Sequence, residues 1–122
     1  MADEIEVSAS LRLNRTDIEA ALSKIGLTFD QTGTEYTQHI QTIGTTEEAI
    51  ELGEITSIGY VLAINLDTTN FVSLRVGTGL TNAIRLDANN GLALFRAGSG
   101  LTAPFAIADT AACRVLFLIL EA

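Results

Sequence analysis

The stretch that decides the fold is residues 60–76, which reads YVLAINLDTTNFVSLRV. Its first residues are almost all apolar, so both faces of the strand they predict are apolar, as in a strand buried inside a sandwich. A turn follows at residues 67–70, where Asp, Thr and Asn favour a tight reversal of the chain. Residues 71–76 then alternate between apolar and polar side chains, which is the period of a half-buried strand. The stretch therefore predicts two strands joined by a turn.

The same pattern of short strands and turns fills the rest of the second half of the chain. Its turns are marked by Asn89-Asn90-Gly91, by Gly98-Ser99-Gly100 and by Pro104. In this half, strands are expected at residues 83–86, 92–95, 105–108 and 113–120. A further strand is expected earlier in the chain, inside residues 35–43. About eight or nine short strands at near-regular spacing predict an antiparallel sandwich or barrel.

The N-terminal segment predicts one strand and the only good helix. Residues 7–13 alternate as a half-buried strand does. Thr16 and Glu19 then have capping-box spacing, and Gly26 stands where a helix would stop; the apolar residues between them, Ile18, Ala21, Leu22 and Ile25, fall on one helical face. Residues 45–55 fit a helical turn that leads into a strand. The expected fold is thus mainly β, with one short N-terminal helix.

The length of 122 residues predicts a single domain, residues 1–122, with residues 1–6 as a flexible arm that orders on a neighbouring molecule. Hydrophobic residues make up 48% of the chain and charged residues 18%, against about 25% charged in an ordinary domain. A small domain exposes a large share of its surface to solvent and needs polar and charged side chains there. This shortage of charge therefore indicates that a partner covers part of the surface. A core rich in Ala and Leu is the alternative explanation.

The net charge of −8 lies entirely in one half of the chain. Residues 1–61 hold eleven acidic and three basic residues, whereas residues 62–122 hold four of each. Phosphate neutralisation needs a basic stripe, and the sequence has none, so nucleic acid is not an expected partner. The N-terminus has no apolar signal segment, and the longest apolar run, residues 115–120, is too short to span a membrane. We expect synthesis in the cytoplasm and no membrane partner.

The sequence offers no catalytic, metal or cofactor site. Its one histidine, His39, lies in a polar strand without a nucleophile-elbow turn, and we expect it to be exposed. One Cys and one His cannot supply the ligands of a zinc site, and Cys113 is expected to be a buried, inert thiol. The three aspartates in turns are interpreted as residues that cap their own turns, not as calcium ligands: Asp67, Asp87 and Asp109. We therefore expect neither an enzyme nor a small-molecule substrate.

Four arginines of the second half are the candidate interface residues, because they lie inside or at the ends of predicted strands: Arg75, Arg85, Arg96 and Arg114. Arginine is favoured at protein interfaces, where these side chains could face an acidic partner surface. The alternative is that they pair with nearby acids or lie on a solvated face.

Three segments of the sequence resemble a known class of proteins, which composition alone does not indicate. Residues 43–54 (IGTTEEAIELGE), residues 59–72 (GYVLAINLDTTNFV) and residues 106–113 (AIADTAAC) resemble small virion proteins of tailed bacteriophages. The resemblance covers roughly residues 33–122 and rests on strands and turns, without a catalytic signature. It implies a jelly-roll β-sandwich that coats the outside of a capsid as a cement or decoration protein, with the major capsid protein and copies of itself as partners.

Two other functions fit the same sequence. A tail, neck or fibre-base component of a virion could use the same fold. A carbohydrate-binding sandwich is also possible, although the chain has no Trp, and its Tyr and Phe residues fall mostly at strand positions suited to a core.

Overall fold

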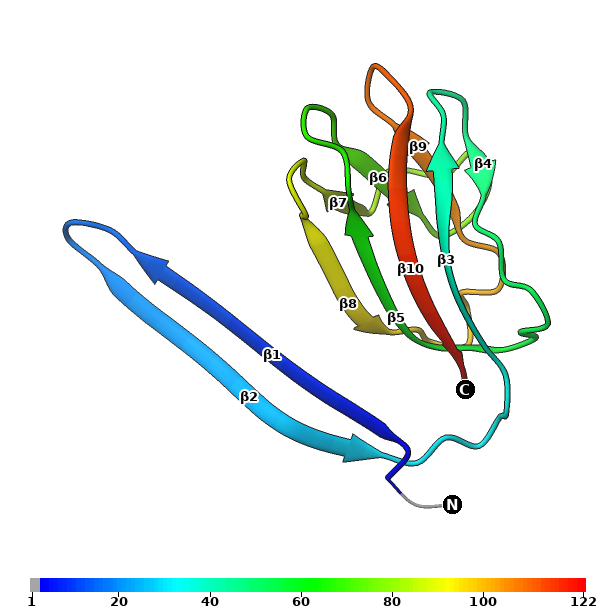
Figure 1. Cartoon of the computed structure of the whole chain (residues 1–122), viewed down its shortest axis with the longest axis horizontal. Coiled ribbons are helices and arrows are strands. Elements are labelled where there is room, and N and C mark those ends of the chain that lie inside the picture. Colours follow the sequence, from blue (N-terminus) through cyan, green and yellow to red (C-terminus); the bar gives the residue numbers. More distant parts are fainter. Residues whose placement is uncertain (1–2) are drawn as a thin grey trace. The chain divides into compact units, whose positions relative to one another are not determined.

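The computed structural model describes residues 3–122, and every regular element in that part of the chain is a β-strand (Figure 1). All the strand pairs are antiparallel. The all-β class expected from the sequence is therefore confirmed. The chain divides into two compact units, residues 1–32 and residues 33–122, which are described separately below.

The first unit is a β-hairpin built from β1 (Ile5–Asn14) and β2 (Glu19–Phe29). Residues 15–18 form the turn, in which the N–H of Arg15 donates to the carbonyl of Ile18 at 2.8 Å. A β-bulge interrupts the pairing, because two residues of β2 stand opposite Ser8 of β1. One of these two is Gly26, whose φ of 70° suits the bulge and whose N–H donates to the Ser8 hydroxyl at 3.0 Å.

The helix predicted from Thr16 to Gly26 is wrong, because this segment is the turn and most of β2. A helix of about three turns is marginal unless its apolar face packs on something. In the hairpin the same residues pair with β1 instead, Leu22 opposite Leu11 and Ala20 opposite Leu13. The glycine expected to end a helix supplies a positive φ to the bulge. Residues 1–2 of the expected arm of residues 1–6 lie outside the described residues, and residues 5–6 belong to β1.

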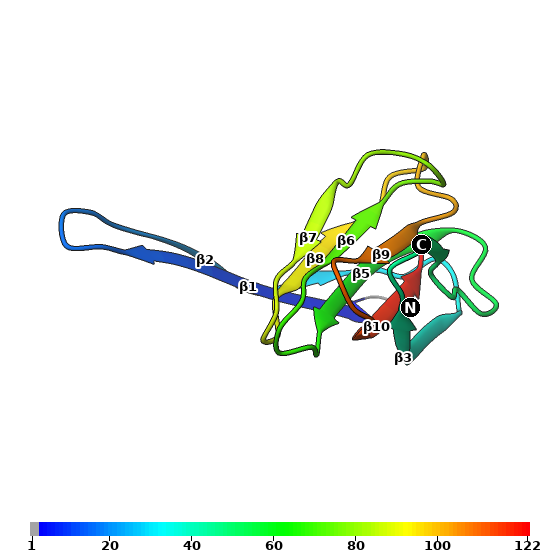
Figure 2. The ribbon, with the colours of Figure 1, turned by 90° about the horizontal axis from the view of Figure 1, so that it is seen from above.

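The second unit contains two four-stranded sheets, seen as two layers in Figure 2. The long sheet has the order β3-β10-β5-β8 and the short sheet has the order β4-β9-β6-β7. The strand bounds are β3 (Tyr36–Ile43), β4 (Glu48–Ala49), β5 (Ile58–Asn65), β6 (Val72–Arg75), β7 (Ile84–Leu86), β8 (Leu92–Arg96), β9 (Phe105–Ala108) and β10 (Cys113–Glu121). The two strands of residues 60–76 thus belong to different sheets. The helical turn expected in residues 45–55 is not formed, since β4 and turns occupy this segment.

The hydrophobic core of this unit lies between the two sheets. The long sheet contributes Phe117 and Val115 of β10, and the short sheet contributes Val72 and Leu86, all of them completely buried. Each deeply buried aliphatic or aromatic side chain stabilises the fold by roughly 1.5–3 kcal/mol. This core therefore holds the short strands of the two sheets together.

A buried asparagine organises the loops at one end of the sheets. Asn65, completely buried, donates through Nδ2 to the carbonyls of Asn70 at 2.9 Å and Leu86 at 3.1 Å. Its Oδ1 accepts the N–H of Asp67 at 3.0 Å. The turn predicted at residues 89–91 lies beside it, with both asparagines at positive φ, and the N–H of Asn90 donates to the Asn65 carbonyl. The side chain of Asn65 thus satisfies polar groups of the 67–70 turn and of β7, and its backbone carbonyl holds the 89–91 turn.

Candidate assembly surfaces

His39 lies on the inner side of β3, so the expectation that it is exposed is wrong. Its ring packs beside that of Phe117, with ring centroids 5.6 Å apart, and its Nδ1 lies 3.0 Å from the Thr37 hydroxyl. Its Nε2 is buried without a hydrogen-bond partner among the described residues. Catalytic histidines are oriented by a group on the second ring nitrogen. The His39 and Thr37 pair lacks that group and therefore lacks the geometry of a catalytic triad.

The acidic and thiol side chains do not form a metal site in residues 3–122, where no group of three or more His, Cys, Asp or Glu could hold an ion. Asp67 caps its own turn, as predicted: its carboxylate accepts the N–H groups of Asn70 at 2.6 Å and Thr69 at 3.0 Å, and these bonds lower its pKa. Cys113 is buried, as predicted. Burial raises the pKa of its thiol, and the nearby charges of Asp67 and Asp109 raise it further. The thiol is accordingly a poor nucleophile.

An apolar cavity of about 40 Å³ lies between the two sheets. Its lining includes Leu74 from the short sheet and Phe117 and Ile119 from the long sheet. The volume is close to that of a single water molecule, and apolar cavities of this kind stay dry. It is far smaller than the pockets of roughly 300–1,000 Å³ that hold small molecules. The cavity is therefore a packing defect of the core.

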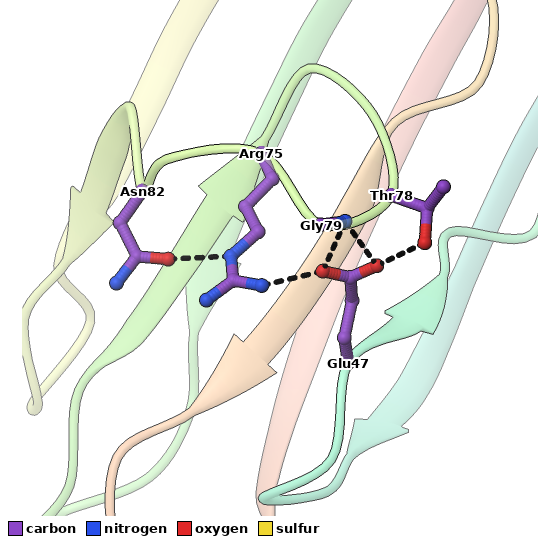
Figure 3. A network of polar contacts seen from close by, with 5 residues as sticks. All are labelled: Glu47, Arg75, Thr78, Gly79 and Asn82. Atoms are coloured by element: carbon purple, nitrogen blue, oxygen red, sulfur yellow. Dashed lines mark hydrogen bonds and ion pairs between the residues drawn. The ribbon is translucent and has the colours of Figure 1, made fainter.

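Arg75, the first of the four candidate arginines, belongs to a polar network that holds the β6–β7 connection (Figure 3). It forms an ion pair with Glu47, and its Nε donates to Asn82 Oδ1 at 2.6 Å. The same Glu47 carboxylate accepts the Thr78 hydroxyl at 2.6 Å and the Gly79 N–H at 2.9 Å. These donors, the Thr78 hydroxyl foremost, lower the pKa of Glu47. Arg75 is thus a structural residue that fixes a loop.

Arg85 and Arg96 are also held by their own unit. Arg85 pairs with Asp87 at 2.7 Å, and its guanidinium lies 3.7 Å from the centre of the Phe71 ring. This stacking is a cation–π contact, which is typical of arginine. Arg96 donates through Nη1 to the carbonyl of Ala97 at 2.5 Å.

The fourth arginine, Arg114, is exposed on β10 opposite Thr42 and forms no ion pair with any residue in the range 3–122. The four arginines do not converge on one patch. Arg75 and Arg85 lie in the short sheet, whereas Arg96 and Arg114 lie in the long sheet.

The first large apolar surface is one face of the hairpin. Residues directly opposite each other in an antiparallel pair share a face, so the register places Leu11 and Leu22 together, and these are 80% and 79% exposed. We name the whole surface the hairpin face; its apolar members are Ile5, Val7, Ala9, Leu11, Leu13, Ala20, Leu22, Leu27 and Phe29. Lys24 is its one charged strand position. The opposite face of the hairpin is mainly polar: besides Ala21, its paired strand positions hold Glu6, Ser10, Arg12, Asn14, Glu19, Ser23 and Thr28.

The second apolar surface is the side of the long sheet that faces away from the core. Because Phe117 and Val115 point into the core, the alternate residues of β10 and their partners point outward. We name this surface the sheet face; its apolar members are Tyr36, Ile40, Tyr60, Leu62, Ile64, Leu92, Leu94, Leu116, Leu118 and Leu120. All are partly or fully exposed, Leu92 to 59%. The charged residues at outward strand positions of this sheet are Arg96 and Arg114.

Sequence reasoning noticed these two surfaces only indirectly. The apolar residues on both faces of residues 60–65 predict a strand covered on both sides, and the shortage of charge indicates that a partner covers part of the surface. Both signals come from the sheet face, but periodicity alone does not say which face of a strand its own chain covers. The hairpin face could not be predicted, because residues 16–26 were assigned to a helix and not to a strand that pairs with β1.

Comparison with known proteins identifies no relative of this chain. No protein-family model matches the chain, and none of the curated proteins or solved structures compared with it matches either. In residues 3–122 there is no helix long and apolar enough to cross a membrane.

Proposed function

We propose that this protein is a structural subunit that works by assembling with other chains, as a jelly-roll cement protein on the outside of a bacteriophage capsid. The observation that carries the assembly role is the sheet face, a continuous surface of ten apolar residues that no strand of residues 33–122 covers. Large exposed apolar patches of this kind mark interaction sites on soluble proteins. The capsid setting rests on the resemblance of residues 43–72 and 106–113 to small virion proteins of tailed phages.

The energetics of burial explain how such a subunit would strengthen a shell. Removing apolar surface from water contributes roughly 25 cal/mol per Å², so a patch of several hundred Å² supplies many kcal/mol before the costs of association. A subunit that binds only the assembled lattice stabilises it by mass action, in proportion to the number of copies bound. The two four-stranded sheets match the jelly-roll arrangement that the resemblance implies.

Co-sedimentation with undecorated capsids tests this function. We expect saturable binding at a copy number comparable to the number of lattice positions, together with a rise in the temperature at which the capsids release their genome. Saturation at a dozen copies or fewer would instead favour a tail, neck or fibre-base component. Absence of binding to capsids and tails alike would overturn the virion role.

A further inference from the structure

We propose that a groove on the outer side of the short sheet binds a small hydroxylated carboxylate, of the kind represented by a sugar acid. The groove has a volume of about 350 Å³ and is lined by Phe71, Ser73, Asn82 and Arg85, with the two residues between Asn82 and Arg85. This volume lies in the roughly 300–1,000 Å³ range of pockets that hold small molecules. The inference goes beyond the assembly role and is independent of it, because the sheet face belongs to the long sheet.

The groove lies over β6, the strand between β9 and β7 of the short sheet. Val72 and Leu74 of this strand belong to the core, so Ser73 between them points to the outer side of the sheet. Arg85 of β7 stands directly opposite Ser73, and residues opposite each other in an antiparallel pair share a face. The register therefore places the hydroxyl and the guanidinium side by side on the outer face.

The Ser73 hydroxyl is a buried polar group without a partner in its own chain. Ser73 is only 4% exposed, and its side chain forms no hydrogen bond with any residue in the range 3–122. In native proteins the large majority of buried side-chain polar atoms have a partner, either in the protein or in ordered water. Because Ser73 lines the groove, the oxygen of a molecule held there can be that partner.

Two contacts fix the guanidinium of Arg85 and leave its end available. Its Nε donates to Asp87 Oδ1 at 2.7 Å, and its Cζ lies 3.7 Å from the centre of the Phe71 ring. Its two Nη atoms donate no hydrogen bond within the described part of the chain. A guanidinium held through Nε and by an aromatic ring presents its Nη atoms as a fork, which matches the two oxygens of a carboxylate.

Asn82 contributes a third donor, whose orientation is fixed by Arg75. The Nε of Arg75 can only donate, so the side-chain oxygen of Asn82 faces it at 2.6 Å and the amide nitrogen lies on the other side (Figure 3). That nitrogen has no acceptor among residues 3–122. Arg75 is itself paired with Glu47, which keeps this arrangement in place. The groove is thus lined by donors from β6, from the loop before β7 and from β7.

The set of donors selects the chemical class of the ligand. A hydroxyl, an amide NH₂ and two guanidinium nitrogens require acceptor oxygens on the ligand. Both arginines of this region already have an acid beside them, so the groove has no surplus positive charge for a dianion such as a phosphate monoester. A carboxylate on the Arg85 fork, with hydroxyl oxygens that accept from Ser73 and Asn82, satisfies the set with a single negative charge. Sugar acids carry both kinds of group on one small ring.

The groove is largely formed before a ligand arrives. Asp87 and Phe71 hold Arg85, whereas Ser73 lies in the middle strand of a sheet. Ordering a rotamer-rich side chain on binding lowers the affinity, and this cost is small where the side chain is already fixed. Preformed pockets with a few convergent polar groups are typical of small-molecule sites.

A titration followed by proton–nitrogen correlation NMR tests the proposal on the full chain at a constant ionic strength of about 0.15 M. The probe is sodium D-glucuronate. The control ligand is D-glucose, which has the same ring with a CH₂OH group in place of the carboxylate. We expect glucuronate to cause saturable shifts with a Kd of about 1 mM or below, centred on the amides of residues 71–73 and 82–85. Glucose should shift these amides only weakly.

Two substitutions test the named donors. Ser73→Ala removes a hydroxyl that has no partner in residues 3–122, so the fold should remain and the affinity for glucuronate should fall about three- to tenfold. Arg85→Lys keeps the charge but lacks the fork, and it should weaken binding about tenfold or more. The matched controls are Ser99→Ala and Arg114→Lys, at exposed positions outside the groove, which should bind as the wild type does.

Circular dichroism of each variant confirms that its strands are still formed. Absence of saturable shifts, equal shifts with glucose, or wild-type affinity in either Ser73→Ala or Arg85→Lys would each overturn the proposal. Shifts spread evenly over the whole spectrum would also overturn it, because they would report a general effect of the salt. Capsid co-sedimentation is measured separately, so the failure of one proposal does not imply the failure of the other.

Discussion

The hairpin and the two-sheet unit are built from similar alternating strands, yet they bury those strands very differently. In the two-sheet unit each sheet supplies the other with a partner layer, and the side chains of Phe117, Val72 and Leu86 are removed completely from water. In the hairpin the corresponding apolar positions, such as Leu11 and Leu22, stay open. An alternating strand pattern therefore specifies that a partner layer is needed, but not whether the same chain provides it.

The largest expected effect compares two leucines at opposite ends of the burial range. Leu86→Ala leaves a cavity in the core and should lower the free energy of unfolding by about 2–5 kcal/mol. Leu11→Ala should change it by less than about 0.5 kcal/mol when measured on dissociated chains, because Leu11 is 80% exposed. Urea denaturation at low protein concentration measures both. Equal losses for the two variants would contradict the comparison.

Buried polar groups sharpen the same contrast. Asn65→Leu keeps the branching of the side chain, although its two methyl groups are bulkier than the amide, and leaves the Leu86 and Asn70 carbonyls and the Asp67 N–H without their partner. We expect a loss of about 2–4 kcal/mol, since each buried polar group left unpaired costs about 1–3 kcal/mol. The control is Asn14→Leu at the exposed end of β1, which should cost less than about 0.5 kcal/mol. A loss below 1 kcal/mol for Asn65→Leu would show that water replaces the missing bonds.

The third and smallest effect concerns acid pH and Glu121 at the end of β10. Its carboxylate accepts the N–H groups of Thr56 at 3.2 Å and Thr34 at 3.1 Å, and these bonds lower its pKa from the ordinary 4.5. A lowered pKa in the folded state gives stability that is present above pH 4.5 and is lost as the pH falls through the folded value. Glu47 acts in the same direction.

We therefore expect the melting temperature of the two-sheet unit to fall on acidification below pH 4.5. The variant Glu121→Gln should melt at a lower temperature at pH 7 and should change less below pH 4.5, because it has one proton fewer to bind. The control Glu19→Gln, on the hairpin, should leave the profile unchanged, since Glu19 makes only an exposed ion pair with Arg12 at 3.7 Å. A wild-type profile retained in Glu121→Gln would contradict the assignment.

The sequence predicted the second half of the fold well because the signals there are local. Alternation within strands and turn residues such as Asn89 and Asn90 act over a few positions, and the structure places strands and a positive-φ turn where they were expected. The helix predicted from Ile18 to Gly26 was wrong because the spacing of its apolar residues suits a helix and a strand about equally. Its pairing with β1 depends on a partner strand that a helical pattern does not reveal.

The candidate site was harder to predict for a related reason. The arginines were chosen by residue type, and the structure divides them between two sheets, with Arg75 bound in a loop network. The two apolar faces depend on register, because Leu92, Ile64, Leu116 and Ile40 become neighbours only when β8, β5, β10 and β3 align. Register across non-consecutive strands is not encoded in any single window of the sequence.

The position of β10 has a consequence for the order of events during synthesis. This strand pairs with β3 on one side and with β5 on the other, and it supplies Phe117 to the core. It is also the last strand of the two-sheet unit to be synthesised. The long sheet cannot close until β10 has emerged, so folding of this unit waits for its last strand, whereas β1 and β2 emerge before it and can pair while the two-sheet unit is still being made.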